Sequence, residues 1–87
     1  MNKNPLSVRD YMRLYSLTLE TVSIRANCTL GEACHALDPE VFDTSPLILV
    51  AKVQGAVEQE LSARGWNGEK KQLWSEFDER IKKLSAG

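Results

Sequence analysis

The chain has 87 residues, 43% of them hydrophobic and 26% charged, with a net charge of −1. These values favour one small globular domain and exclude a protein that coats nucleic acid by charge alone. No apolar run approaches the ~20 residues that cross a membrane, and residues 1–20 lack the continuous apolar core of a signal peptide. We therefore expect a single domain over residues 1–87, a cytoplasmic location and no membrane partner.

The charged residues are unevenly distributed along the chain. Residues 1–26 carry four basic side chains against two acidic ones, whereas residues 27–60 carry six acidic side chains against Lys52 alone. The last third is mildly basic again. Any face that binds an anion should therefore involve the N-terminal third.

A first helix is expected after Ser7, which forms with Asp10 a pattern similar to a capping box. Its apolar residues recur at spacings of three and four: Val8, Tyr11, Met12 and Tyr15. The segment YSLT ends this helix. Thr18 can cap a second helix that stops at Asn27, because asparagine tolerates the left-handed backbone at a helix end.

Thr29 followed by Glu32 matches a full capping box, so a third helix is expected over about Leu30–Leu37. Ser45-Pro46 is typical of a cap followed by proline at the first position of a longer helix, which would extend to Arg64 and close at Gly65. The apolar stripe of this long helix consists of Leu47, Val50, Val53, Val57 and Leu61. A strand over LILVAKV is the alternative, but AVEQELSAR continues with good helix formers.

The segment GWNG at 65–68 indicates a turn before a last helix over about Glu69–Leu84. The apolar face of that helix holds Leu73, Trp74, Phe77, Ile81 and Leu84. This face can fold back on the long helix or pair with a second copy of the chain. The expected fold class is all-α, with about five helices and no credible strand pairing.

Two short helices joined by a tight turn form the helix-turn-helix unit, whose second helix enters the DNA major groove. The two helices cross closely, so their contact positions must be apolar or small. Residues 19–38 meet most of these demands. The five expected buried positions hold Val22, Ala26, Cys28, Ala33 and Ala36. Ser23 occupies the close-contact position, where alanine is usual, and Asn27 occupies the turn position, where glycine is usual.

With these residues the chain resembles the phage-repressor class of helix-turn-helix domains, the Cro and lambda-repressor-like family. The segment VRDYMRLYSLTLE is similar to the first helix of the family and the connection after it. SPLILVAKVQGAV looks like its proline-introduced fourth helix. The resemblance covers about residues 6–58. The end of the long helix, the GWNG turn and the C-terminal helix (59–87) lie outside it.

The resemblance implies a small transcriptional regulator that reads duplex DNA with the helix starting at Thr29. The residues implied to face the bases are Thr29, Leu30, Gly31, Cys34, His35 and Asp38. The implied phosphate contacts are Lys3, Arg9, Arg13, Thr18 and Arg25. A homodimer suits such a reader because a two-fold protein matches a two-fold site, and its interface would use Leu73, Trp74, Phe77, Ile81 and Leu84. An origin in a phage or mobile element rests on the resemblance and on size.

The main alternative is a small protein-binding inhibitor or adaptor, of the antitoxin, immunity or anti-defence type, on a helical scaffold. The acidic middle of the chain favours it, since Glu32 and Asp38 would repel phosphate, and so does the scarcity of side chains suited to reading bases.

Cys28, Cys34 and His35 do not have the spacing of a zinc site, and Cys34 and His35 point ~100° apart on a helix. We therefore expect no metal, no cofactor and no enzymatic activity.

Overall fold

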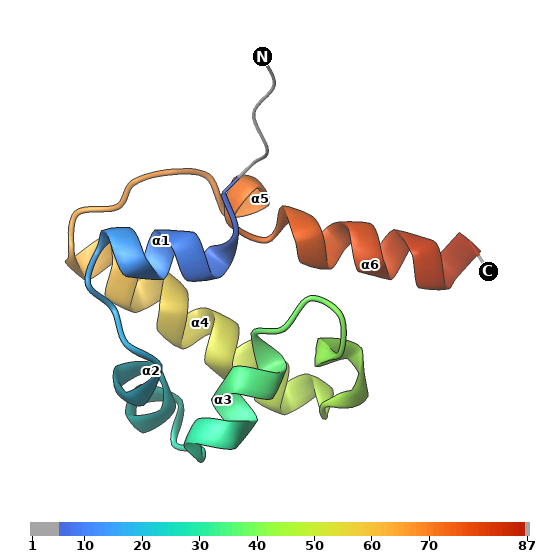
Figure 1. Cartoon of the computed structure of the whole chain (residues 1–87), viewed down its shortest axis with the longest axis horizontal. Helices are drawn as coiled ribbons and strands as arrows, with labels where there is room; N and C mark the ends of the chain where they lie inside the picture. The colour runs from blue at the N-terminus through green and yellow to red at the C-terminus, as the bar shows by residue number, and fades with distance from the viewer. Residues whose placement is uncertain (1–5, 87) are drawn as a thin grey trace.

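The computed structural model describes residues 6–86 and is helical throughout its regular segments (Figure 1). The α-helices are α1 (Val8–Leu14), α2 (Leu19–Ala26), α3 (Leu30–Ala36), α4 (Leu47–Ala63), α5 (Lys70–Leu73) and α6 (Ser75–Ala86), and a 3-10 turn, η1 (Phe42–Thr44), precedes α4. Residues 6–86 contain no strand, which confirms the all-α prediction. No helix in this range is long and apolar enough to cross a membrane.

The first three helices begin at the caps that the sequence indicates. The hydroxyl of Ser7 and the carboxylate of Asp10 form a reciprocal capping box, and Thr29 and Glu32 form a second one. The Thr18 hydroxyl accepts a hydrogen bond from the Thr21 amide at 3.2 Å. The start of α4 differs from the prediction, because no side chain caps it: Pro46 stands before its first helical residue, and Ser45 ends η1 instead.

Helix α4 runs across the middle of the molecule, with α1, α2 and α3 packed against it (Figure 1). Its buried residues are Val50, Val53, Ala56, Val57 and Leu61. Leu47 does not belong to this face, since 87% of its surface is exposed. The reason is geometric: a step of three residues falls about 60° short of a full helical turn, so Leu47 lies at the trailing edge of the stripe.

The C-terminal segment folds back on the rest of the chain. Leu73, Trp74 and Phe77 are buried in the same core as the residues of α1–α4, and they are therefore not available as a dimer interface. Ile81 and Leu84 remain about half exposed, at 48% and 53%. The predicted single helix over 69–84 is also wrong, because Trp74 leaves helical geometry (φ −106°, ψ 22°) and divides it into α5 and α6.

The GWNG segment also contributes to the core. Gly65 ends α4 with a φ of 104°, as the sequence predicts. Trp66 is then buried at 9% exposure, and its ring packs edge-on against Tyr11 with centroids 6.4 Å apart. The connection after α4 is therefore anchored on α1 through Trp66, while residues 67–69 are exposed.

Candidate nucleic-acid interface

The turn between α2 and α3 has the predicted left-handed residue. Asn27 adopts φ 59° and ψ 52°, a conformation that L-residues other than asparagine and aspartate seldom accept. The Cys28 amide donates to the Ser23 carbonyl at 3.0 Å and the Asn27 amide donates to the Ile24 carbonyl at 3.2 Å. These bonds satisfy the last carbonyls of α2 and fix the direction in which α3 begins.

Small side chains allow α2 and α3 to pack closely against each other and against α4. Val22, Ala26, Ala33 and Ala36 are at most 4% exposed. Ser23 is also buried, and its hydroxyl donates to the Glu20 carbonyl at 2.8 Å. The hydroxyl, which the usual alanine lacks, therefore has a hydrogen-bond partner. Cys28 is half-buried. All the positions predicted to lie at this contact therefore do so.

The other face of α3 lies in solvent. The six residues implied to face bases are all exposed: Thr29, Leu30, Gly31, Cys34, His35 and Asp38. The Thr29 hydroxyl is partly engaged, because it accepts a hydrogen bond from the Glu32 amide at 3.1 Å. The structure thus brings this predicted set together on and around α3, with Thr29 at its N-cap and Asp38 just beyond its C-cap.

His35 is held in a defined orientation. Its Nε2 lies 2.7 Å from the Thr44 hydroxyl oxygen, and that hydroxyl donates its hydrogen to the Val41 carbonyl, also at 2.7 Å. Since a hydroxyl has one hydrogen, Nε2 must donate to Thr44. A neutral His35 then carries an acceptor at Nδ1.

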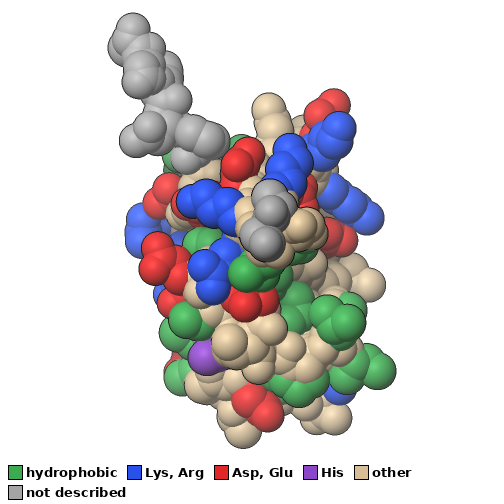
Figure 2. Space-filling model, turned by 90° about the vertical axis from the view of Figure 1, so that its right-hand side faces the viewer, with side chains coloured by type: hydrophobic (Ala, Val, Ile, Leu, Met, Phe, Trp, Pro, Cys, Tyr) green, Lys and Arg blue, Asp and Glu red, His purple; other side chains and the backbone are tan. Residues whose placement is uncertain are grey.

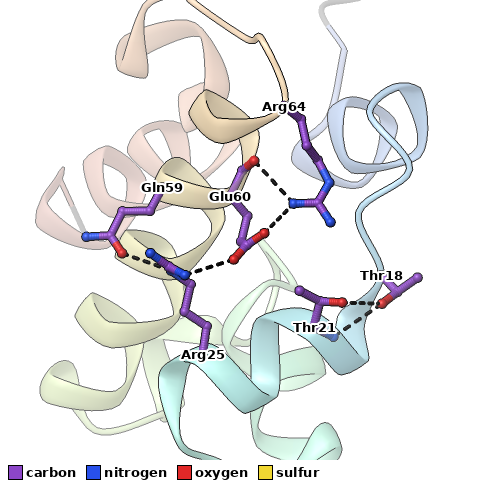
Figure 3. A network of polar contacts seen from close by, with 6 residues as sticks. All are labelled: Thr18, Thr21, Arg25, Gln59, Glu60 and Arg64. Carbon is purple, nitrogen blue, oxygen red and sulfur yellow. Dashed lines mark hydrogen bonds and ion pairs between the residues drawn. The ribbon is translucent and has the colours of Figure 1, made fainter.

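Arg25 differs from the other candidate phosphate contacts because it is committed to α4. Its Nε donates to Gln59 Oε1 and its Nη1 to Glu60 Oε2, both at 2.9 Å. Glu60 also pairs with Arg64 (Figure 3). The Glu60–Arg64 pair, four residues apart, has a sequence signal, whereas the partners of Arg25 lie 34 and 35 residues away and only the fold reveals them.

The remaining phosphate candidates belong to the N-terminal part of the chain. Arg9 is exposed on α1, and Arg13 lies 3.2 Å from the Asp10 carboxylate. Thr18 is at the start of α2, where its hydroxyl lies 3.0 Å from that of Thr21 (Figure 3). Lys3 falls outside the residues that the structure describes.

The surface around α3 is not basic. Residues 29–45 contain no Lys or Arg, and their four acidic residues are Glu32, Asp38, Glu40 and Asp43. One of these, Asp43, is paired with Arg80 at 3.2 Å. In Figure 2 the charged side chains crowd the upper half of the molecule, and hydrophobic ones are prominent in the lower half. The groove face would therefore rely on other elements for phosphate contacts.

The two thiols differ in environment. Cys34 is exposed on α3. Burial raises the pKa of the Cys28 thiol above its ordinary value, and the nearby negative charge of Glu32 raises the same pKa further, while Lys52 opposes both. Within residues 6–86 no three side chains of the metal-binding types converge.

Comparisons with protein-family models, with curated proteins and with solved structures found no match.

Proposed function

We propose that α2 and α3 form a helix-turn-helix and that the protein is a small regulator that binds duplex DNA through the exposed face of α3. The observation that carries the proposal is the left-handed turn at Asn27, which joins two helices packed through small residues and leaves the predicted base-facing residues in solvent. This is the arrangement by which a helix-turn-helix presents its second helix to the major groove.

The side chains on α3 support only a few base contacts. His35 offers an oriented imidazole with a free acceptor at Nδ1, and Thr29 retains acceptor capacity beside its cap bond. Leu30 can contact a thymine methyl group. Backbone contacts would come from Arg9 and Arg13 on α1 and from the start of α2 at Thr18.

A binding titration tests this proposal. Fluorescence anisotropy with a labelled random duplex, at two salt concentrations, should show binding that falls steeply as salt rises. Selection from a random duplex library should then give a preferred sequence, and His35→Ala should change that preference. Arg9→Ala should weaken binding to all sequences alike. Absence of binding at the lower salt concentration would exclude DNA as the ligand.

Arg25 gives a sharper test because its charge is already neutralised. Glu60→Gln removes the negative partner while keeping a similar side-chain shape. If Arg25 faces the phosphates, this variant should bind random duplex severalfold more tightly, and Arg25→Ala in the same background should cancel the gain. Identical affinities for all three proteins would place Arg25 outside the interface.

A protein ligand is the second candidate, favoured by apolar exposure beside an acidic surface. Ile24 is 79% exposed and Leu30 is 47% exposed, on the two helices of the unit. A photo-cross-linking residue at position 30 should give one discrete adduct in cells under this reading, and the same residue at Lys71, on α5, should not. DNA cross-linking at position 30 would support the regulator instead.

A further inference from the structure

His35 lies on the exposed face of α3, but its ring is held by a residue outside that helix. Thr44, in η1, accepts a hydrogen bond from Nε2 of His35 at 2.7 Å, and its own hydroxyl donates to the Val41 carbonyl at 2.7 Å. Within residues 6–86 the bond to Thr44 is the one hydrogen bond that the imidazole makes. The Thr44 contact therefore decides how the ring is presented to a ligand.

This contact fixes both the orientation and the tautomer of the ring. The torsion that turns an imidazole has two main settings, which exchange Nδ1 with the carbon Cδ2, and only one of them keeps Nε2 beside Thr44. Because the Thr44 hydrogen is given to Val41, Nε2 must carry the ring proton. A neutral His35 therefore presents an acceptor at Nδ1, rather than an N–H or a C–H group, on the edge that remains.

Thr44 has a fixed position because the other two residues of η1 are joined to α6. Phe42 packs edge-on against Phe77 with ring centroids 4.7 Å apart, and Asp43 pairs with Arg80 at 3.2 Å. The hydroxyl that holds the imidazole is therefore placed by the C-terminal helix, which lies outside the segment that resembles the phage repressors.

A single acceptor restricts what the ring can bind on a DNA duplex. Phosphate oxygens accept hydrogen bonds and do not donate them, so Nδ1 has no partner on the backbone. In the major groove the donors are the exocyclic amino groups, N6 of adenine and N4 of cytosine, whereas guanine and thymine present acceptors. An acceptor at Nδ1 therefore selects an amino group and rejects the oxygens of guanine and thymine.

We propose that Thr44 is a positioning residue for sequence reading, and that Nδ1 of His35 accepts a hydrogen bond from the exocyclic amino group of an adenine or a cytosine. The inference rests on the proposed function, because it assigns the base chemistry that the same face of α3 recognises. It gives a role to a residue that lies outside the helix-turn-helix and nine positions along the chain from the side chain it orients.

Duplexes that lack the amino group test the base chemistry. Selection from a random library at about pH 8, where histidine side chains are neutral, should give a preferred site, and comparison with His35→Ala locates the base pair that His35 reads. Replacing its adenine by purine, or its cytosine by 2-pyrimidinone, removes the amino group and should weaken binding about threefold or more. The base that responds identifies the source of the amino group.

The control for altered base pairing is His35→Ala, which should bind the natural and the substituted duplex alike. Equal affinity of the parent protein for the two duplexes overturns the inference. So does an equal loss of affinity in the parent protein and in His35→Ala, because the loss then arises in the DNA and not at the imidazole.

Two variants at position 44 test the positioning role. Thr44→Val keeps the shape of the side chain without its hydroxyl, and it should bring the affinity ratio of the two duplexes close to one. Binding to random duplex and the circular dichroism spectrum should stay unchanged. Thr44→Ser keeps the hydroxyl and should retain the ratio of the parent protein. A ratio that survives Thr44→Val, or that Thr44→Ser abolishes equally, refutes the role given to the hydroxyl.

Failure of this inference and failure of the proposed function give different results. Absence of binding to any duplex at low salt excludes the proposed function and this inference with it. A selected site that is bound normally but is indifferent to the amino group leaves the proposed function intact and removes this inference alone.

Discussion

The ring of Phe77 packs edge-on against the ring of Phe42, with centroids 4.7 Å apart and planes inclined at 62°. This contact joins α6 to η1, the short segment that follows α3, although the two segments are far apart in the sequence. Arg80 and Asp43, at 3.2 Å, reinforce the same junction from the surface. The pair explains why the C-terminal helix returns to the core instead of leaving its apolar face for another molecule.

The Phe42–Phe77 contact predicts a measurable coupling. Phe42→Leu and Phe77→Leu should each lower the free energy of unfolding by about 1–2 kcal/mol, because both rings are buried. The double variant should lose less than the sum, by about 0.5–1.5 kcal/mol, which is the range for a direct aromatic pair. Urea unfolding followed by circular dichroism at 222 nm gives all three values. Strict additivity would show that the rings do not interact.

Two glycines should respond to alanine in opposite directions. A Cβ at Gly68 would lie 2.8 Å from Nε1 of the Trp66 indole, so Gly68→Ala should displace a buried ring and cost about 1–3 kcal/mol. Gly31 is inside α3 with no atom within 4 Å of its Cβ position, so Gly31→Ala should stabilise the protein by about 0.5–1 kcal/mol. Thermal unfolding and tryptophan fluorescence distinguish the two. A stabilised Gly68→Ala variant would contradict the packing described for Trp66.

The capping box of α1 predicts an acid-dependent loss of stability. The Ser7 amide and hydroxyl, and secondarily Arg13, hold the pKa of Asp10 below its ordinary value. Because the folded pKa is the lower one, Asp10 stabilises the folded protein above the unfolded pKa of about 4, and the effect disappears as the pH falls through the folded pKa. Asp10→Asn should therefore be less stable than the parent protein at pH 6, and this difference should disappear as the pH falls through the lowered folded pKa of Asp10. Urea midpoints measured against pH test this, and a constant difference across the range would argue against it.

The two thiols should differ in reactivity. Cys34 is exposed, whereas Cys28 is half-buried with a raised pKa, so iodoacetamide at pH 8 should alkylate Cys34 several times faster. Bound duplex DNA should slow the alkylation of Cys34, because this residue lies on the face of α3 proposed to enter the groove. Mass spectrometry of time points measures both rates. Unchanged Cys34 labelling at saturating duplex would contradict the assigned orientation.

The local features of the fold could be predicted from the sequence because each depends on residues within one or two helical turns. The caps at Ser7, Thr18 and Thr29, the left-handed turn at Asn27 and the closure at Gly65 all have short-range signals, and all are confirmed. The spacing of small residues between positions 22 and 36 likewise predicted the contact of α2 with α3.

The features that the sequence did not reveal depend on partners far along the chain. The helix break at Trp74 accompanies an indole hydrogen bond to Glu58, and the burial of Trp66 depends on Tyr11. The pairing of Arg25 with Glu60 changes the expected role of a predicted phosphate contact for the same reason. The exposure of Leu47 could not be predicted from spacing alone. Leu47 lies three residues before Val50, which fits a hydrophobic pattern, but three residues turn the helix by only 300°, so Leu47 points away from the core.

The central position of α4 has a consequence for how the polypeptide can be divided. The helices before it pack on this element, and the segment after it packs against Tyr11, Phe42 and Glu58, so neither part encloses a finished core alone. A nick in the exposed stretch at 67–69 should leave a large fragment with an uncovered apolar surface and a short fragment carrying Leu73, Trp74 and Phe77. Mixing the two pieces should restore the native spectrum by fragment complementation.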